Sequence, residues 1–151
     1  MTAQRAKAIE YAARGWSLKP VPANMKRAVI KGWPDTEFGP ADFPNGTNIA
    51  IRLGKRSQNL VDADLDCEEA IALAPLYLRE TGATFGRPSA PRSHWLYFAA
   101  EARYEEFVDP ISKDTLIELR ADGRDGGAHI TVVPPSVTDG ERREWCARDG
   151  R

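Results

Sequence analysis

Short apolar runs separated by turn-forming residues predict several strands along the chain. Two runs lie close together, NIAIRLG at 48–54 and LVDADL at 60–65, with the polar turn KRSQN between them. Three further runs follow at residues 93–100, 115–120 and 128–133. Short runs rich in β-branched or aromatic residues and bounded by polar residues or glycine are typical of strands. We therefore expect these runs to build a sheet.

Two segments predict helices. In residues 3–16 apolar side chains recur at i, i+3, i+4 and i+7, and Gly15 closes the helix. The members of this stripe are Ile9, Ala12, Ala13 and Trp16. Residues 68–80 predict a second helix with acids in its first turn, where Pro75 indicates a break or a second start. Between 16 and 43, Pro, Gly and charged residues predict loops and short extended pieces.

The order of these elements predicts an α+β fold, with a mixed, mainly antiparallel sheet flanked by helices. The glycine-rich stretch ADGRDGG at 121–127 predicts a hairpin turn between the last two strands, and PPS at 134–136 ends the final strand. A chain of 151 residues can bury a core of its own. We expect one domain over residues 1–151.

Composition and charge exclude several classes of protein. Hydrophobic residues make up 42% of the chain and charged residues 28%, and no apolar run reaches the length of a membrane span. The net charge of −1 excludes a polyanion binder that works through overall charge. Cys67 and Cys146 have no metal-binding spacing, and the N-terminus has no secretory signal. We expect a cytoplasmic protein with no membrane partner.

Three aspartates alternate along the second strand. Asp62, Asp64 and Asp66 project to one face if the strand continues through Asp66. Their mutual repulsion requires compensation by solvent or by a cation, and oxygen ligands favour magnesium or manganese. From this stretch alone, a solvated acidic face and a metal site are equally good interpretations.

Two further residues favour a site. Glu118 lies in the apolar run LIELR, where a carboxylate is unexpected unless it is stabilised. A bound ligand could stabilise it, as could an ion pair with Arg120 or an exposed position at the edge of the sheet. His94 precedes an apolar strand and follows Arg92, a setting that suits contact with an anionic phosphate. A packed histidine is the alternative.

The chain resembles the bifunctional DNA primase/polymerase N-terminal domain, the prim-pol branch of the archaeo-eukaryotic primases of plasmid and phage replication proteins. The resemblance runs from about Ala8 to Trp145 and depends on the order of several short pieces. These are YAARGWSLKPV, KGWP, NIAIRLG, LVDADLDCEEA, RPSAPRSHWLYF, IELRADG and TVVPPS. It implies a primase/polymerase fold with an RRM-like catalytic core.

The resemblance also implies site residues. Asp64 and Asp66 match the two metal ligands of the family's first motif, and Glu118 matches the carboxylate of its third. Asp62 stands where a hydrophobic residue is more common, and is an additional candidate ligand. His94 matches the histidine that contacts the triphosphate, and Arg92, where a small residue is usual, is expected to add a phosphate contact.

Nucleotidyl transfer explains this set of residues. Divalent ions can activate a 3′-hydroxyl and stabilise departing pyrophosphate, and the three carboxylates could hold them. Arginines neutralise phosphates well, and the candidates are Arg87, Arg92 and Arg120. Lys31 and Arg52 are weaker candidates along the nucleotide or template path.

The sequence therefore predicts a magnesium- or manganese-dependent DNA primase/polymerase that acts on nucleoside triphosphates and a DNA template or primer. A non-catalytic nucleotide- or nucleic-acid-binding module and a metal-dependent nuclease are the alternatives. The stretch GERREWCARDGR at 140–151 has no closing signal. We expect the domain to be the N-terminal part of a longer replication protein, with a helicase domain in the same chain.

Overall fold

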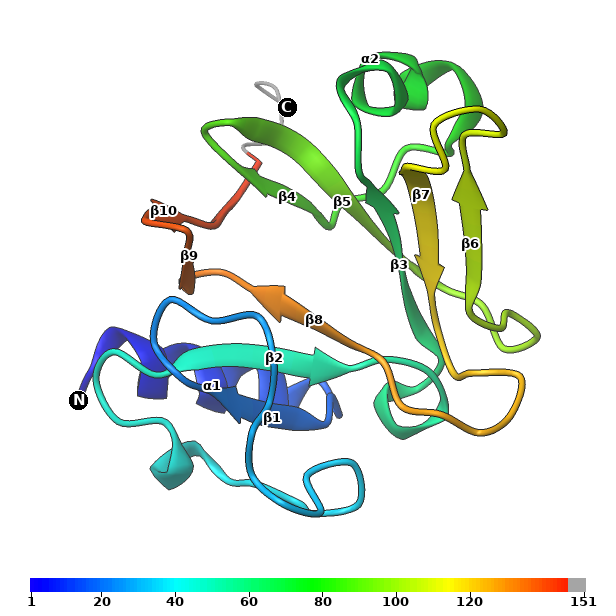
Figure 1. Ribbon diagram of the computed structural model, residues 1–151. Coiled ribbons are helices and arrows are strands. Elements are labelled where there is room, and N and C mark those ends of the chain that lie inside the picture. Colours follow the sequence, from blue (N-terminus) through cyan, green and yellow to red (C-terminus); the bar gives the residue numbers. More distant parts are fainter. Residues whose placement is uncertain (147–151) are drawn as a thin grey trace.

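A six-stranded sheet, a three-stranded sheet, a two-stranded pair and two α-helices make up the described part of the chain (Figure 1). The computed structural model describes residues 1–146, so the last part of the stretch GERREWCARDGR lies outside the described residues. All pairs of neighbouring strands are antiparallel. The α+β prediction with a mainly antiparallel sheet is confirmed.

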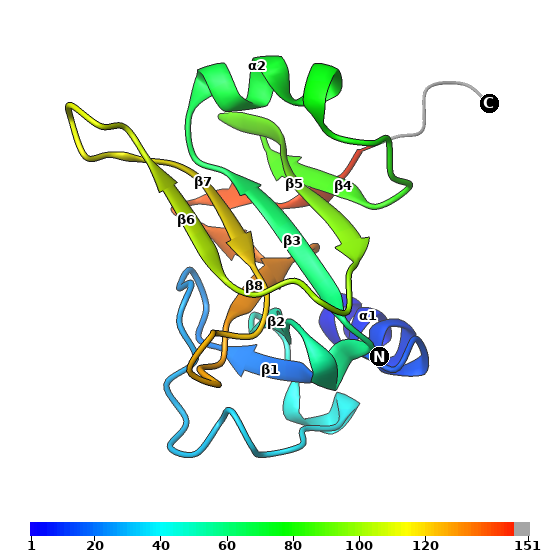
Figure 2. The same ribbon diagram turned by 90° about the vertical axis from the view of Figure 1, so that its right-hand side faces the viewer.

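The larger sheet has six strands, in the order β11-β4-β5-β3-β7-β6. Figure 2 shows it with β3 near the middle and α2 across one end. Its strands are β3 (Leu60–Leu65), β4 (Thr84–Arg87), β5 (Ala90–Phe98), β6 (Glu105–Val108), β7 (Thr115–Arg120) and β11 (Glu144–Trp145). The central position of β3 gives it a partner on both sides, β5 and β7.

The smaller sheet has three strands, in the order β1-β2-β8, and lies beside α1. Its strands are β1 (Leu18–Val21), β2 (Asn48–Arg52) and β8 (Ile130–Val133). A short pair, β9 (Val137–Thr138) with β10 (Glu141–Arg142), follows β8, and two 3₁₀ turns, η1 (Pro40–Asp42) and η2 (Lys55–Ser57), lie in the connections. Three short strands thus follow the strand that was expected to be the last.

Helix α1 (Ala3–Ala13) starts at Thr2, whose side chain accepts a hydrogen bond from the Arg5 backbone N–H. Its predicted existence is confirmed, and Gly15, at a φ of 79°, follows its end. The predicted buried face is wrong. The helix buries Ala8 and Tyr11, while Ile9 is 42% exposed. Tyr11 takes the core position because its hydroxyl donates to the Pro134 carbonyl at 2.7 Å.

Helix α2 (Glu68–Tyr77) is continuous through Pro75 and ends three residues before the predicted end at Glu80. The predicted break is therefore wrong. Pro75 lies close to the end of the helix. Because proline has no backbone N–H, only one backbone carbonyl of the helix, four residues earlier, loses its hydrogen bond there. Cys67 caps the start, its sulfur accepting from the Ala70 backbone N–H.

The predicted hairpin between residues 115–120 and 128–133 is also wrong. Strand β7 belongs to the six-stranded sheet and β8 to the three-stranded sheet. The glycine-rich stretch between them instead carries the chain from one sheet to the other, with a tight turn between Gly123 and Gly127. Strands β2 and β3 are likewise adjacent in sequence but lie in different sheets.

Two clusters of apolar side chains pack on opposite faces of the large sheet. The main core joins α1 to both sheets, and its members are Ala8, Tyr11, Trp16, Leu18, Phe43, Ile49, Ile51, Leu53, Leu60, Phe85, Leu96 and Val133. On the opposite face of β3, Ala63 and Leu65 pack with α2. Because side chains alternate along a strand, the aspartates of β3 point away from α2. No helix in residues 1–146 has the length and apolarity to cross a membrane.

Candidate active site: an acidic cluster in a cleft lined with arginines

A cavity of about 850 Å³ lies on the face of β3 that carries the aspartates. Its walls come from β3, the start of α2, the β4–β5 hairpin, β7, β8 and the loop around residues 26–33. Carboxylates lie on one part of its wall, and arginines, histidines and a tryptophan on others.

Asp64, Asp66 and Glu118 meet in this cavity. One carboxylate oxygen from each lies within 4.8 Å of the others. The register explains the meeting, because Asp64 on β3 is paired directly with Glu118 on β7. The backbone N–H of Asp66 still donates to Leu116 at 2.9 Å, so the alternation of β3 extends to Asp66. Three of the residues predicted from sequence are therefore brought together.

Two acids of this cluster, Asp64 and Asp66, have a raised pKa. The Asp66 side chain reaches solvent in the cavity, but its carboxylate is partly surrounded by protein. This partial burial, followed by the charges of Asp64 and Glu118, raises the pKa of Asp66 to about 6. Burial also raises the pKa of Asp64, against the lowering effect of His94 and Arg120. Crowded carboxylates of this kind favour a bound cation. An all-oxygen donor set within a few ångströms fits magnesium or manganese better than zinc.

Arg120 neutralises part of this charge. Its Nη2 lies 3.0 Å from Asp64 Oδ2, and its Nε lies 3.3 Å from Glu118 Oε2. Its Nη1 also donates to the Ile130 carbonyl at 3.0 Å. The ion pair of Glu118 with Arg120, which the sequence offered as an alternative to a metal site, is thus present. Glu118 nevertheless also belongs to the acidic cluster.

Asp62 is separate from the other two aspartates. It is fully buried, and its Oδ2 accepts from His94 Nδ1 at 2.8 Å and from Thr131 Oγ1 at 2.7 Å. It is not a member of the group of acids that could share an ion. We therefore leave Asp62 out of the proposed metal ligands.

His94 is buried in the cavity wall and held on several sides. Its ring stacks on Phe85 with centroids 4.5 Å apart and planes 6° from parallel. Its Nδ1 lies 3.5 Å from Asp64 Oδ1 in addition to the contact with Asp62. Its Nε2 lies 2.9 Å from Nη1 of Arg143.

Arg143 is a cavity residue that the sequence did not single out. It lies between β10 and β11 and is buried. The only signal was the arginine-rich stretch GERREWCARDGR, which does not distinguish Arg143 from its neighbours. Tyr104 was also missed. Its hydroxyl lies 3.1 Å from Glu118 Oε2, and burial with the Glu118 hydrogen bond raises the Tyr104 pKa to about 12.

The other predicted residues divide into two groups. Arg87 lines the cavity and pairs with Glu141 at 3.2 Å. The cavity wall also contains His129, whose ring stacks on Tyr104 with centroids 4.0 Å apart. Arg92 does not line the cavity, because its guanidinium lies over the ring of Trp95 at 5.0 Å.

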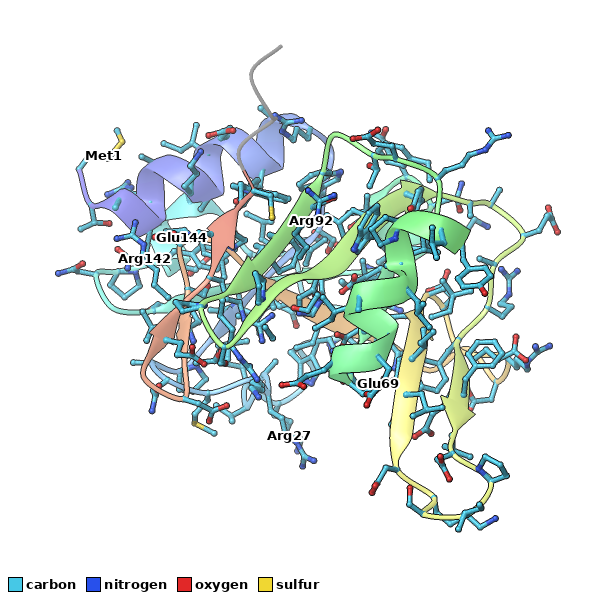
Figure 3. All side chains as sticks on the ribbon, turned by 90° about the horizontal axis from the view of Figure 1, so that it is seen from above. Met1, Arg27, Glu69, Arg92, Arg142 and Glu144 are labelled. Carbon is cyan, nitrogen blue, oxygen red and sulfur yellow. The ribbon has the colours of Figure 1, made fainter. Side chains whose placement is uncertain are left out.

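Two more candidates also lie outside the cavity lining. Arg52 is buried and donates to the Pro34 carbonyl, and Lys31 is exposed. Lys26 and Arg27, which the sequence did not single out, line the cavity instead. Figure 3 shows Arg27 and Arg92 apart from each other. We leave Arg92, Arg52 and Lys31 out of the proposed site.

Comparison with known proteins identifies the family. The family model described as bifunctional DNA primase/polymerase, N-terminal, matches residues 8–150. Neither the curated proteins nor the solved structures gave a match. Because the family model covers almost the whole chain, the chain belongs to the family of bifunctional DNA primase/polymerase N-terminal domains.

Proposed function

We propose that this chain is a divalent-metal-dependent DNA primase/polymerase that joins nucleotides to a 3′-hydroxyl on a DNA template. The observation that carries the proposal is the meeting of Asp64, Asp66 and Glu118 in a cavity whose wall also bears arginines. Membership of the primase/polymerase family supports the class of reaction. The setting in a plasmid- or phage-type replication protein is part of the same proposal.

Asp64, Asp66 and Glu118 are the residues that would hold magnesium or manganese. A divalent ion held there would supply activation of the 3′-hydroxyl and stabilisation of the departing pyrophosphate. The protein holds these carboxylates in place through the pairing of β3 with β7. Tyr104 donates to Glu118 and fixes the orientation of that carboxylate.

The basic residues of the cavity would receive the triphosphate. Arg87 and Arg120 lie on its wall, and Lys26 and Arg27 extend the positive charge into the loop beside it. Guanidinium groups bind phosphate oxygens through paired N–H donors, which gives both orientation and charge neutralisation. Arg120 can exchange between carboxylate and phosphate partners because it contacts Asp64 and Glu118 directly.

Aromatic rings on the cavity wall would hold a base. Trp33 lines the cavity, and so does His129, which is stacked on Tyr104 with planes 3° from parallel. Base–aromatic stacking tolerates every base, as a template-directed enzyme requires.

Primer extension tests this proposal. A 5′-labelled primer on a DNA template is incubated with the protein, deoxynucleoside triphosphates and Mg²⁺ or Mn²⁺. We expect extension by the unmodified protein and a loss on the order of 10²-fold for Asp66→Asn, since a lost metal-site interaction costs at least 10–100-fold. Asp66 suits this test because it is exposed and its change leaves the core intact.

Glu101→Gln is the matched control, because Glu101 is an exposed acid that does not line the cavity. It should extend primers at the unmodified rate. A labelled primer that shortens in the absence of nucleoside triphosphates would identify a nuclease instead. Nucleotide binding without extension under either metal would leave only the binding module.

A further inference from the structure

A loop over residues 22–34 borders the cavity and carries an excess of positive charge. Residues 11–34 contain no aspartate or glutamate, although 22 of the 151 residues of the chain are acids. The loop contributes Lys26, Arg27 and Trp33 to the cavity wall. Lys31 lies on the same loop, exposed and outside the cavity lining. The loop therefore extends a basic surface from the cavity to the outside of the molecule.

Two cations of this loop are not neutralised by the protein. Lys26 pairs with Asp139 at 2.9 Å. Arg27 and Lys31 are exposed, and within residues 1–146 neither has a salt bridge. Figure 3 shows Arg27 at the margin of the molecule. Cations that are exposed and unpaired can contact the phosphates of a nucleic acid.

Trp33 differs from the other three tryptophans, whose rings pack on protein groups. The rings of Trp16 and Trp145 lie on Tyr11, with centroids 5.6 and 6.3 Å away. Trp95 lies beneath an arginine guanidinium. In the described part of the chain, the half-buried Trp33 ring has no stacking or cation–π partner and belongs to no core cluster. Its face is therefore available to a ligand.

Contacts at both ends hold the loop in place. Near its start, the buried side chain of Asn48 donates to the Met25 carbonyl at 3.1 Å. At its end, the buried Arg52 donates to the Pro34 carbonyl. Arg52 thus supports the loop from the small sheet instead of contacting a ligand. Because residues 27–33 lie between two fixed points, a ligand need not order the whole loop when it binds.

We propose that this loop binds the single-stranded DNA template as it enters the cavity, with Trp33 stacked on a base and Arg27 and Lys31 on phosphates. The identity of the strand as a template rests on the proposed function. A ligand that contacts both Trp33 and Lys31 must extend beyond the cavity, as a strand does. Unpaired bases leave their faces open to an aromatic ring, so the surface suits a single strand better than a duplex.

Binding of single-stranded DNA at several salt concentrations tests the phosphate contacts. Fluorescence anisotropy measures the affinity for a labelled oligothymidylate of about 12 nucleotides, without nucleoside triphosphates or divalent ions. For the double variant Arg27→Gln/Lys31→Gln we expect weaker binding. The slope of log affinity against log salt concentration should become shallower by about 1.4, since each phosphate contact on a single strand contributes about 0.7. An unchanged slope, or no binding by the unmodified protein, would overturn the proposal.

The double variant Arg5→Gln/Arg79→Gln is the matched control. It makes the same change in net charge, and both arginines are exposed and outside the cavity lining. It should keep the slope of the unmodified protein. An equal change of slope in the two double variants would show that affinity follows net charge, which contradicts a local surface.

Trp33→Leu tests the stacking contact. Its affinity for the oligothymidylate should fall by roughly 5-fold to 150-fold, the range of one base stack, and Trp33→Phe should lose less because it keeps a ring. The control is Tyr77→Leu, which removes a ring that is 80% exposed on α2 and outside the cavity lining, and it should bind normally. Thermal unfolding checks each variant. Equal losses in the two Trp33 variants, or none, would overturn the stack.

Two comparisons identify the occupant of the loop. The unmodified protein should bind the single strand more tightly than a blunt duplex of equal length, and Trp33→Leu should lose this preference. Lys31→Gln should weaken binding of the oligothymidylate but leave the affinity for dATP, measured by calorimetry in Ca²⁺, unchanged. A preference for the duplex, or an equal loss of dATP affinity in Lys31→Gln, would contradict a surface for the template strand.

The outcomes separate this inference from the proposed function. If the unmodified protein binds the oligothymidylate through Trp33 but extends no primer, the polymerase proposal fails and the strand-binding surface stands. If it extends primers while the variants of Arg27, Lys31 and Trp33 bind single strands normally, only the inference fails.

Discussion

Asp62, Asp64 and Asp66 project from the same face of β3 into three different environments. Asp62 is fully buried against His94 and Thr131, Asp64 is buried beside Arg120, and Asp66 is exposed at the cavity. The repulsion that an alternating row of acids implies is thus relieved separately for each residue. Only Asp64 and Asp66 have carboxylate oxygens close enough to Glu118 to bind one cation together with it.

The raised pKa of Asp66 predicts that metal binding depends on pH. A metal ligand must be deprotonated, and burial with two neighbouring carboxylates raises the Asp66 pKa to about 6. Affinity for Mn²⁺ should therefore fall as the pH is lowered through about 6, by roughly tenfold for each unit below that value. Calorimetric titration with Mn²⁺ at pH 5 and pH 7.5 measures this change.

The control is Asp66→Asn, which should bind Mn²⁺ more weakly at pH 7.5 and with a smaller pH dependence. Equal Mn²⁺ affinity of the unmodified protein at both pH values would contradict this account of Asp66.

The raised pKa of Asp66 also affects the stability of the metal-free protein. The free energy of unfolding should fall as pH rises from 3.8 to about 6, because the folded state holds the proton more tightly than the unfolded state.

The connection between β2 and β3 carries the chain from one sheet to the other. Gly54 lies at its start with a φ of +89°, which an L side chain rarely adopts. A Cβ at Gly54 would also lie 2.3 Å from Cγ of Asp122. The Asp122 carboxylate accepts from the Lys55 backbone N–H at 2.8 Å and ties this connection to the end of β7. The connection therefore leaves no space for a side chain.

Gly54→Ala should lower the free energy of unfolding more than the matched change Gly46→Ala. Gly46 has almost the same φ, +88°, but no atom lies near its Cβ position. The backbone alone costs about 1–2 kcal/mol at either site. The clash with Asp122 should add about 1–3 kcal/mol at Gly54. Chemical denaturation of both variants measures the difference, and equal losses would show that the crowding has no energetic effect.

Local sequence patterns predicted where the strands lie better than they predicted which strands pair with each other. The bounds of β3 and β7 are those of the predicted runs, because apolar alternation is a local property. The buried face of α1 was wrong because a long-range hydrogen bond from Tyr11 to Pro134 selects it. The predicted hairpin failed for the same reason, since pairing of β8 with β2 rather than β7 is a long-range choice.

At the scale of the whole molecule, the cavity lies between the large sheet and β8 of the small sheet. That Asp64, Asp66, Glu118 and His94 all line the cavity could be expected, because three of them lie on strands with clear patterns and Asp66 directly follows β3. Their roles stay a prediction. The position of Arg143 in the cavity could not be expected, because its neighbours form strands of only two residues and its contact with His94 spans 49 positions. The orientation of Asp62 toward His94 likewise appears only after β3 is paired with β5.

One diffraction measurement tests the central claim, that the acidic cluster holds the ion that works with a nucleoside triphosphate. Crystals are soaked with Mn²⁺ and dATP, and anomalous data are collected at the manganese edge. The account predicts a peak within about 2.0–2.5 Å of oxygens from Asp64, Asp66 and Glu118, with the triphosphate in the same cavity. A manganese peak only elsewhere, or a triphosphate bound outside the cavity, would contradict it.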